Sequence, residues 1–251
     1  MDKREMIKLS PSMVHQGSLQ LINREYPFWD TLDKKKLVMV EPPGCNLDGQ
    51  TAVMLYHLLG KLRSRGAIRL VSGYRSLKEQ KLIYQEAVCD KGQTYADCFV
   101  APPGYSEHHS GLALDLEGSG PLFEAFCFQA PKYGFIQRYP RGKEHITGYQ
   151  EESWHFRYVG FPHSMIMTQN RMTLEEYLVF LRQFSPERPL RFFHKEQQAE
   201  IFFLPVYGEE KMELMQHIAY QISGNNHDGV IATVWKIAAT PVLCRCAAKA
   251  Q

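Results

Sequence analysis

Two short apolar segments that each carry charged side chains most constrain how this 251-residue chain can fold. The first, "LALDLE" at 112–117, places Asp115 among small and apolar neighbours, and the second, "WHFRYVGF" at 154–161, contains His155 and Arg157. Both segments have the composition and the alternation of buried β-strands. Because burying a carboxylate without a partner is costly, Asp115 requires an arginine, a capping role or a metal ion.

Composition places the chain among ordinary globular proteins, with 44% hydrophobic and 22% charged residues. A formal charge of +2, without a face-sized basic cluster, argues against a nucleic-acid binder. No apolar run approaches the roughly 20 residues that cross a bilayer, so we expect no membrane span. The N-terminal segment has charges but lacks the apolar stretch of a signal peptide. We therefore expect a cytoplasmic protein whose six cysteines stay reduced.

Local signals predict helices between the strands. Leucines at i, i+3, i+4 and i+7 predict an amphipathic helix within 48–65. Ser76 with Glu79, and Thr173 with Glu176, have the spacing of capping boxes. In a capping box the two side chains satisfy backbone donors at a helix N-terminus, so each pair predicts the start of a helix.

The predicted secondary structure changes after "SPERP" at 185–189. The segments "EIFFLPVY" and "IAYQISGNNHDGVIATVWK" are strand-like, and "GNNHDG" within the second is a turn signal. We expect two domains, a larger one at 1–189 and a small β-rich C-terminal appendage at 190–251. The fold class is α+β, with a mainly antiparallel sheet flanked by helices.

The candidate chemistry lies in His108, Asp115, His155 and Glu152. Two histidines and one carboxylate that leave a fourth position open are typical ligands of a catalytic zinc ion. Glu152 stands three residues before His155, where a free carboxylate would accept a proton from an activated water molecule. The sequence therefore indicates a zinc hydrolase, with a structural salt bridge as the alternative for Asp115.

Three motifs carry a family resemblance: "SGYRS" at 72–76, S-x-H-x-x-G-x-A-x-D at 106–115 and E-x-W-H at 152–155. They resemble the zinc D-Ala-D-Ala peptidases of the VanY, VanX and VanXY group, whose fold is of the hedgehog and D,D-peptidase type. The resemblance covers roughly residues 70–170. The final "YQISGNNHDGVIATVWK" is similar to the C-terminal part of VanXY-type enzymes in particular.

The resemblance implies a role for each matching residue. His108, Asp115 and His155 would bind Zn²⁺, and Glu152 would act first as general base and then as general acid. His109 occupies a position that the motif leaves variable, so we do not make it a ligand.

Three more residues match positions that act on the substrate. Arg75 would polarise the scissile carbonyl and stabilise the oxyanion. Its place before a helix N-terminus also favours an anion there. Ser106 and Gln80 would bind the end of the substrate, against the plainer reading that they cap a turn and cover a helix surface.

The implied reaction is hydrolysis of the terminal D-Ala-D-Ala amide in the dipeptide, in muramyl pentapeptide precursors or in both. Such an activity would contribute to vancomycin resistance. The alternatives are an L,D-carboxypeptidase acting on tetrapeptide stems and a non-catalytic, hedgehog-like zinc-binding module. Glu152 favours an enzyme, because a binding module needs no base beside an open zinc position. The sequence leaves a homodimer open.

Overall fold

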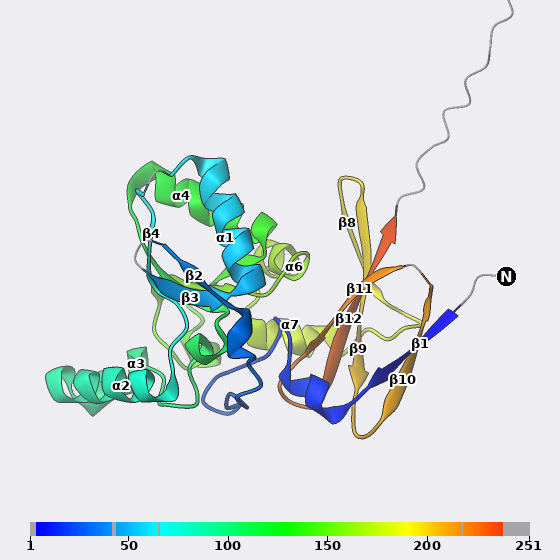
Figure 1. Ribbon diagram of the computed structural model, residues 1–251, viewed down its shortest axis with the longest axis horizontal. Helices are drawn as coiled ribbons and strands as arrows, with labels where there is room; N and C mark the ends of the chain where they lie inside the picture. The colour runs from blue at the N-terminus through cyan, green and yellow to red at the C-terminus, as the bar shows by residue number, and fades with distance from the viewer. Residues whose placement is uncertain (1–3, 42–43, 65, 217, 238–251) are drawn as a thin grey trace, which may run out of the picture.

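A four-stranded antiparallel sheet, the central sheet, organises the first part of the chain in the computed structural model, which describes residues 4–41, 44–64, 66–216 and 218–237 (Figure 1). Its strand order is β4 (Arg69–Ser72), β5 (Ala113–Glu117), β7 (Glu152–Tyr158) and β6 (Phe135–Tyr139). Both segments predicted to be buried strands are therefore neighbours in this sheet.

Helices α1 (Gly49–Leu62) and α4 (Gly120–Gln129) cover one face of the central sheet. The predicted amphipathic helix is α1, and the side chain of Asp48 caps it by accepting hydrogen bonds from the backbone of its first turn. Phe126 of α4 packs edge-on against Phe156 of β7, with ring centroids 5.1 Å apart. This apolar layer fixes which face of β7 is turned away from the helices.

The alternation predicted for β7 is confirmed from His155 to Tyr158 but not at Trp154, which lines a cavity together with His155. Phe156 and Tyr158 belong to the apolar layer under α1 and α4, while His155 and Arg157 are buried on the opposite face. Trp154 is 43% exposed at the start of the strand. The period-2 geometry of the strand thus separates a packing face from a polar, buried one.

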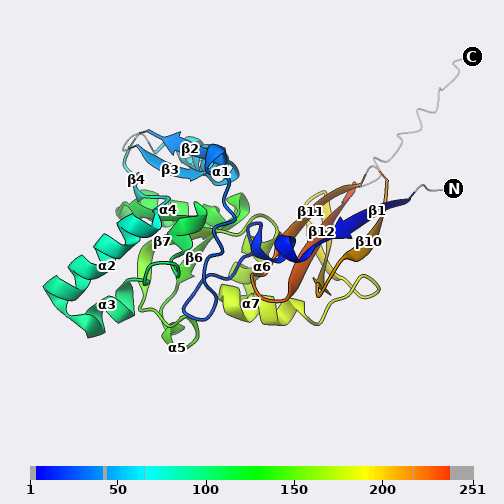
Figure 2. The same ribbon diagram turned by 60° about the horizontal axis from the view of Figure 1, so that its bottom comes forward.

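Both capping boxes form as predicted. Ser76 and Glu79 start α2 (Leu77–Lys91), and Thr173 and Glu176 start α7 (Leu174–Leu181). Helix α2 packs beside α3 (Gln93–Phe99) at the end of the molecule far from the C-terminal strands (Figure 2). The other elements before residue 190 are β2 (Leu37–Val40), β3 (Cys45–Asp48), α5 (Glu144–Thr147), α6 (His163–Asn170) and the short 3₁₀ turns at Pro11–His15, Lys34–Lys36, Glu107–Ser110 and Ala130–Tyr133.

A second antiparallel sheet, the C-terminal sheet, forms where β-rich structure was predicted. Its order is β11 (Ala219–Gly224), β12 (Gly229–Ile237), β9 (Gln197–Pro205) and β8 (Leu190–His194). The strand β10 (Glu210–Met215) instead pairs with β1 (Arg4–Leu9) at the start of the chain. The N-terminal strand thus lies with the C-terminal strands, although sequence reasoning assigned all of residues 1–189 to the first domain.

A shared apolar core joins the two sheets. Leu174 and Tyr177 of α7 pack in one cluster with Ile201 of β9 and Ile231 of β12. His163 of α6 bridges the same region, because its Nδ1 lies 2.8 Å from the Tyr177 hydroxyl and its Nε2 lies 3.0 Å from Oγ1 of Thr233. The C-terminal strands are therefore packed against the rest of the chain.

The helices and the cysteines bear on the expected absence of a membrane span and on the expected reduced thiols. Among the described residues, none of the helices combines the length and the apolar character that crossing a membrane requires. Cys45, Cys89, Cys98 and Cys127 are free thiols. The remaining cysteines, at 244 and 246, lie outside the described residues.

The buried His163 predicts a loss of stability in mild acid. Burial lowers its pKa to about 3, whereas an unfolded chain protonates its histidines near pH 6.5. The stability contributed by neutral His163 is thus complete above about pH 6.5 and is lost as the pH falls toward 3. The melting temperature should therefore fall less between pH 7 and pH 5 in His163→Gln than in the wild type. Equal decreases in calorimetry would contradict this.

Candidate active site

The strand register of the central sheet places Asp115 beside His155. Ser72 of β4 pairs with Asp115 of β5, and Asp115 pairs in turn with His155 of β7. These three side chains form a row across the sheet, on the face opposite to α1 and α4. The carboxylate oxygen Oδ1 of Asp115 lies 3.0 Å from Nδ1 of His155. Backbone pairing, rather than loop geometry, sets this contact.

His108 enters the same cluster from the 3₁₀ turn that precedes β5. The turn ends at Gly111, whose φ of 71° is left-handed and whose position would bring an added Cβ within 2.9 Å of the Asp48 backbone nitrogen. Glycine is therefore required there by conformation and by space. The turn is further held by His108 itself, since its Nδ1 lies 2.6 Å from the carbonyl oxygen of Gly73. This contact leaves Nε2 facing Asp115, 3.3 Å from Oδ2.

The three expected ligands meet in a geometry that suits a metal ion. One ligand atom from each of His108, Asp115 and His155 lies within 4.8 Å of the other two, and all three residues are buried. Two imidazole nitrogens and one carboxylate oxygen are a typical donor set for zinc in an enzyme. The described residues therefore contain a possible metal site at the position that the sequence indicated.

Charge interactions within the cluster favour an ionised aspartate. Burial alone would raise the pKa of Asp115, but the neighbouring His108 and His155 hold it well below its usual range. Burial and the cation of Arg75 lower the pKa of His108 to about 4, which keeps its imidazole neutral. For His155, burial is outweighed by Asp115 and Glu107, which raise its pKa to about 9. A metal ion would have to displace a proton from His155, so its binding depends on pH.

Glu152 lies next to the cluster, in an irregular part of β7. In regular extended chain, residues three apart point to opposite faces. Here Gln137 pairs with Phe156 but Tyr139 pairs with Glu152, so β7 is not a regular strand between Glu152 and His155. Oε2 of Glu152 lies 3.7 Å from Nδ1 of His155. Burial raises the pKa of Glu152 to about 7, a value that suits proton transfer near neutral pH.

The neighbouring Glu151 points elsewhere. Its carboxylate pairs with Arg141, with Oε2 lying 2.7 Å from Nε of the arginine. Glu152 lines the cavity that holds the metal-ligand cluster, while Glu151 does not. Of the two adjacent glutamates, only Glu152 is placed to act on a bound molecule.

Arg75 reaches the cluster from the turn between β4 and α2. Its Nε donates to Oγ of Ser72, and its Nη2 lies 2.5 Å from Oδ2 of Asp115. The side chain is only 19% exposed, so it is not a free surface arginine. A guanidinium held in this way is a fixed source of positive charge at the cavity wall.

Ser106 and Gln80 line the same cavity, which has a volume of about 240 Å³. Ser106 caps the 3₁₀ turn by accepting a hydrogen bond from the backbone of His108. Gln80 donates to the carbonyl of Ala101 and accepts from Arg75. Both side chains thus line the cavity, and both already have partners within the chain. Their substrate-binding role stays a prediction.

A buried charge cluster next to the site was not predicted from the sequence. Glu107, next to His108, is buried between Arg138 of β6 and Arg157 of β7, and its Oε1 accepts from both arginines at 2.8 and 2.7 Å. Burial would raise the pKa of Glu107, but the two guanidinium groups hold it well below its usual range. Two arginines inside otherwise apolar strands were the signal, because a buried arginine needs a carboxylate.

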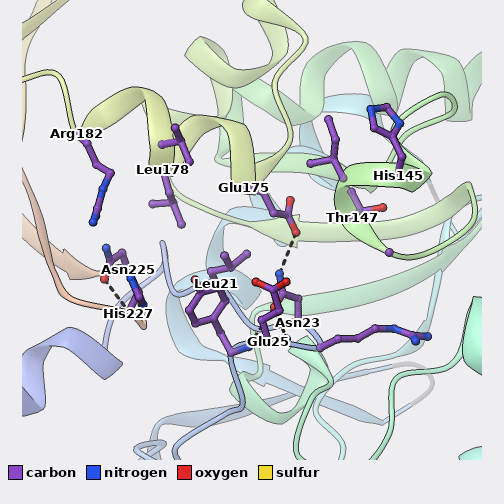
Figure 3. A pocket seen from close by; sticks show the side chains of 15 residues that line it. Leu21, Asn23, Glu25, His145, Thr147, Glu175, Leu178, Arg182, Asn225 and His227 are labelled. Atoms are coloured by element: carbon purple, nitrogen blue, oxygen red, sulfur yellow. Dashed lines mark hydrogen bonds between the residues drawn. The ribbon is translucent and has the colours of Figure 1, made fainter.

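A larger cavity, of about 540 Å³, lies between the segment that contains Leu21 and Asn23, helix α7 and the turn at Asn225 (Figure 3). It contains none of the metal-ligand cluster. One of its wall residues, Glu175, holds the other side of Arg138 through two hydrogen bonds of 3.0 and 2.6 Å. The smaller cavity, with the cluster, Glu152 and Arg75, is therefore the candidate active site.

Known proteins are similar to this chain both in the sequence around the candidate site and in the fold. The family model VanY, D-alanyl-D-alanine carboxypeptidase, matches residues 46–161, a span that contains every residue of the candidate site named above. The bifunctional D-Ala-D-Ala dipeptidase and D-Ala-D-Ala carboxypeptidase VanXYC of Enterococcus gallinarum is 38% identical over 183 residues. That match covers 66% of this chain and 96% of the relative.

Two solved structures extend the comparison. The vancomycin resistance D,D-dipeptidase VanXYg, in complex with a D-Ala-D-Ala phosphinate analogue, has a TM-score of 0.89 at 35% identity and covers 93% of this chain and 100% of its own. A variant of the D,D-pentapeptidase VanY from a VanB-type resistance cassette, in complex with Zn(II), has a TM-score of 0.59 at 33% identity and covers 64% of this chain and 98% of its own. The chain therefore belongs to the VanY family of D-alanyl-D-alanine carboxypeptidases, and the VanXY type matches it along nearly its whole length.

Proposed function

We propose that this protein is a zinc-dependent D,D-peptidase that hydrolyses the terminal D-Ala-D-Ala amide of the free dipeptide and of muramyl pentapeptide precursors. The observation that carries the proposal is the placement of Glu152 in one cavity with the cluster of His108, Asp115 and His155. A bifunctional relative and a structural neighbour with a D-Ala-D-Ala analogue support the substrate class. The neighbour that holds Zn(II) supports the metal.

The side chains divide the reaction between them. A zinc ion held by His108, Asp115 and His155 would supply Lewis acidity that activates water and polarises a carbonyl group. Glu152 accepts the proton of the attacking water and later delivers it to the leaving amine of D-Ala. Arg75 donates hydrogen bonds to the negative charge that develops on the carbonyl oxygen.

The other contacts in the cavity would orient the substrate. We propose that Ser106 and Gln80, which line the cavity, bind the end of the substrate by hydrogen bonds. Binding of the terminal D-Ala would fix the scissile amide relative to Glu152. The reaction then becomes effectively unimolecular, because the reacting groups are already held in the right orientation.

The biological role that we propose is resistance to vancomycin. Removal of D-Ala-D-Ala ends would leave precursors that end in D-Ala-D-Ser or D-Ala-D-Lac, which vancomycin binds poorly. The structural neighbour VanXYg is itself a vancomycin resistance D,D-dipeptidase, which supports this role. Expression in a susceptible host that also makes such alternative ends should raise the vancomycin concentration needed to stop growth. An unchanged concentration would contradict the role.

The activity is tested by incubating the purified zinc protein with D-Ala-D-Ala, with a pentapeptide ending in D-Ala-D-Ala and with a tetrapeptide ending in a single D-Ala. Mass spectrometry should show loss of one D-Ala from the pentapeptide and cleavage of the dipeptide, with the tetrapeptide intact. Cleavage of the tetrapeptide alone would favour the L,D-carboxypeptidase alternative. No cleavage of any peptide by zinc-loaded protein would favour the hedgehog-like binding module.

Glu152→Ala should keep zinc and the fold but lose about 10³-fold or more in kcat on the pentapeptide, because general base and general acid assistance of roughly 10² to 10⁴ each disappear together. Glu151→Ala is the matched control, since that residue pairs with Arg141 outside the cavity, and its rate should stay near the wild type. Equal losses in the two variants would contradict the assignment of Glu152.

Arg75→Ala should lower kcat by roughly 10² or more and leave the zinc content unchanged, because the guanidinium acts on charge that appears only in the transition state. Zinc content is measured by atomic absorption on the same preparation as the kinetics. A wild-type rate in the variant would contradict a catalytic role and would leave Arg75 only a structural role in the turn before α2.

We also propose that the protein works in the cytoplasm, a reducing compartment where thiols stay unpaired. The four cysteines in the described part of the chain are free, which supports this. All six thiols should then react with a thiol reagent after denaturation of protein prepared without reductant. Fewer than six reactive thiols would contradict a reducing location.

A further inference from the structure

The second oxygen of Glu107 is directed at His155. Its first oxygen, Oε1, accepts hydrogen bonds from both Arg138 and Arg157, while Oε2 lies 3.5 Å from Nε2 of His155. Both Oε2 and this Nε2 are buried, and neither has another hydrogen-bond partner in the part of the chain that the structure describes. Two complementary, unpartnered atoms in a buried site therefore face each other.

Charge balance for the arginines does not account for this orientation. Glu175, which pairs with only one of these two arginines, offers one oxygen to each of two guanidinium nitrogens of Arg138. Glu107 instead places both arginines on one oxygen and leaves the other free. Arg157 is further satisfied by the backbone carbonyls of Ser18 and Gln20. The arginines thus hold Glu107 in place, and the free oxygen serves His155.

The opposite edge of the His155 ring faces the metal-ligand cluster. Its Nδ1 lies 3.0 Å from Asp115 and 3.7 Å from Glu152. A histidine that donates one ring N–H to a carboxylate keeps its lone pair on the other nitrogen and becomes a more basic ligand. The ring of His108 is held differently, by the neutral carbonyl of Gly73.

We propose that Glu107 is a positioning residue for zinc binding: it holds the proton of His155 on Nε2, fixes the ring and leaves Nδ1 free for the metal. This inference rests on the zinc site of the proposed function. Arg138 and Arg157 hold Oε1 and so fix the side chain of Glu107, which leaves Oε2 available to His155. The buried charge cluster is thereby part of the metal site.

Glu107→Gln tests the proposal at constant side-chain volume. The amide oxygen of glutamine can still accept hydrogen bonds from the two arginines. The amide is neutral, however, and its NH₂ group cannot accept a proton from Nε2 of His155. The dissociation constant for Zn²⁺, measured by competition with a chelator, should rise about 10- to 100-fold. The matched control is Glu175→Gln, which removes the other carboxylate of Arg138 without contacting His155. It should lower the melting temperature and leave the zinc dissociation constant within about twofold of the wild type.

A zinc affinity of Glu107→Gln within about twofold of the wild type, or an equal loss in Glu175→Gln, would overturn the proposal. If Glu107→Gln does not fold, nitrogen-15 NMR of the wild-type zinc protein decides. The proposal requires the His155 proton on Nε2, and a proton on Nδ1 would overturn it. Because neither readout needs hydrolysis, a protein whose zinc affinity depends on Glu107 but which cleaves no peptide would refute the proposed function alone.

Discussion

The cross-strand pair of Asp115 and His155 is the contact on which the rest of the site depends. Antiparallel pairing sets the two side chains next to each other on one face of the central sheet, and the apolar layer under α1 and α4 prevents that face from turning over. The turn at Gly111 then delivers His108 to the same point. A one-residue slip between β5 and β7 would separate Asp115 from His155, so the register of the sheet and the possible metal site are specified together.

Several ionisable groups are buried here, and each is held by a partner of opposite charge. Burial by itself would neutralise Asp115 and Glu107, yet the pKa values of both stay well below their usual range because of nearby histidines or arginines. Glu152 is the exception, since burial raises its pKa to about 7. The same surroundings therefore keep two carboxylates ionised and prepare a third for proton transfer.

Much of this arrangement was predictable from the sequence, for identifiable reasons. Alternation in the segment around His155 predicted which side chains share its face, and the capping boxes predicted the starts of α2 and α7. The motif around His108 and Asp115 indicated the cluster through a family resemblance. The role of these residues as zinc ligands, like the homodimer, stays a prediction.

Features that depend on tertiary contacts were not predictable. Local alternation would place Glu152 on the face opposite to His155, but β7 is irregular between them and the two side chains lie together. Pairing of the first strand with β10 joins segments at opposite ends of the chain, which no local pattern reports. The partnership of Glu107 with Arg138 and Arg157 likewise requires knowing which strands are neighbours.

Diffraction at the zinc absorption edge, from crystals of the protein grown with zinc, tests the central claim most directly. One anomalous peak per chain should lie about 2.0 to 2.2 Å from Nε2 of His108, a carboxylate oxygen of Asp115 and Nδ1 of His155. A fully occupied zinc ion bonded to a set that excludes any of these three residues would contradict the claim that they form the catalytic metal site.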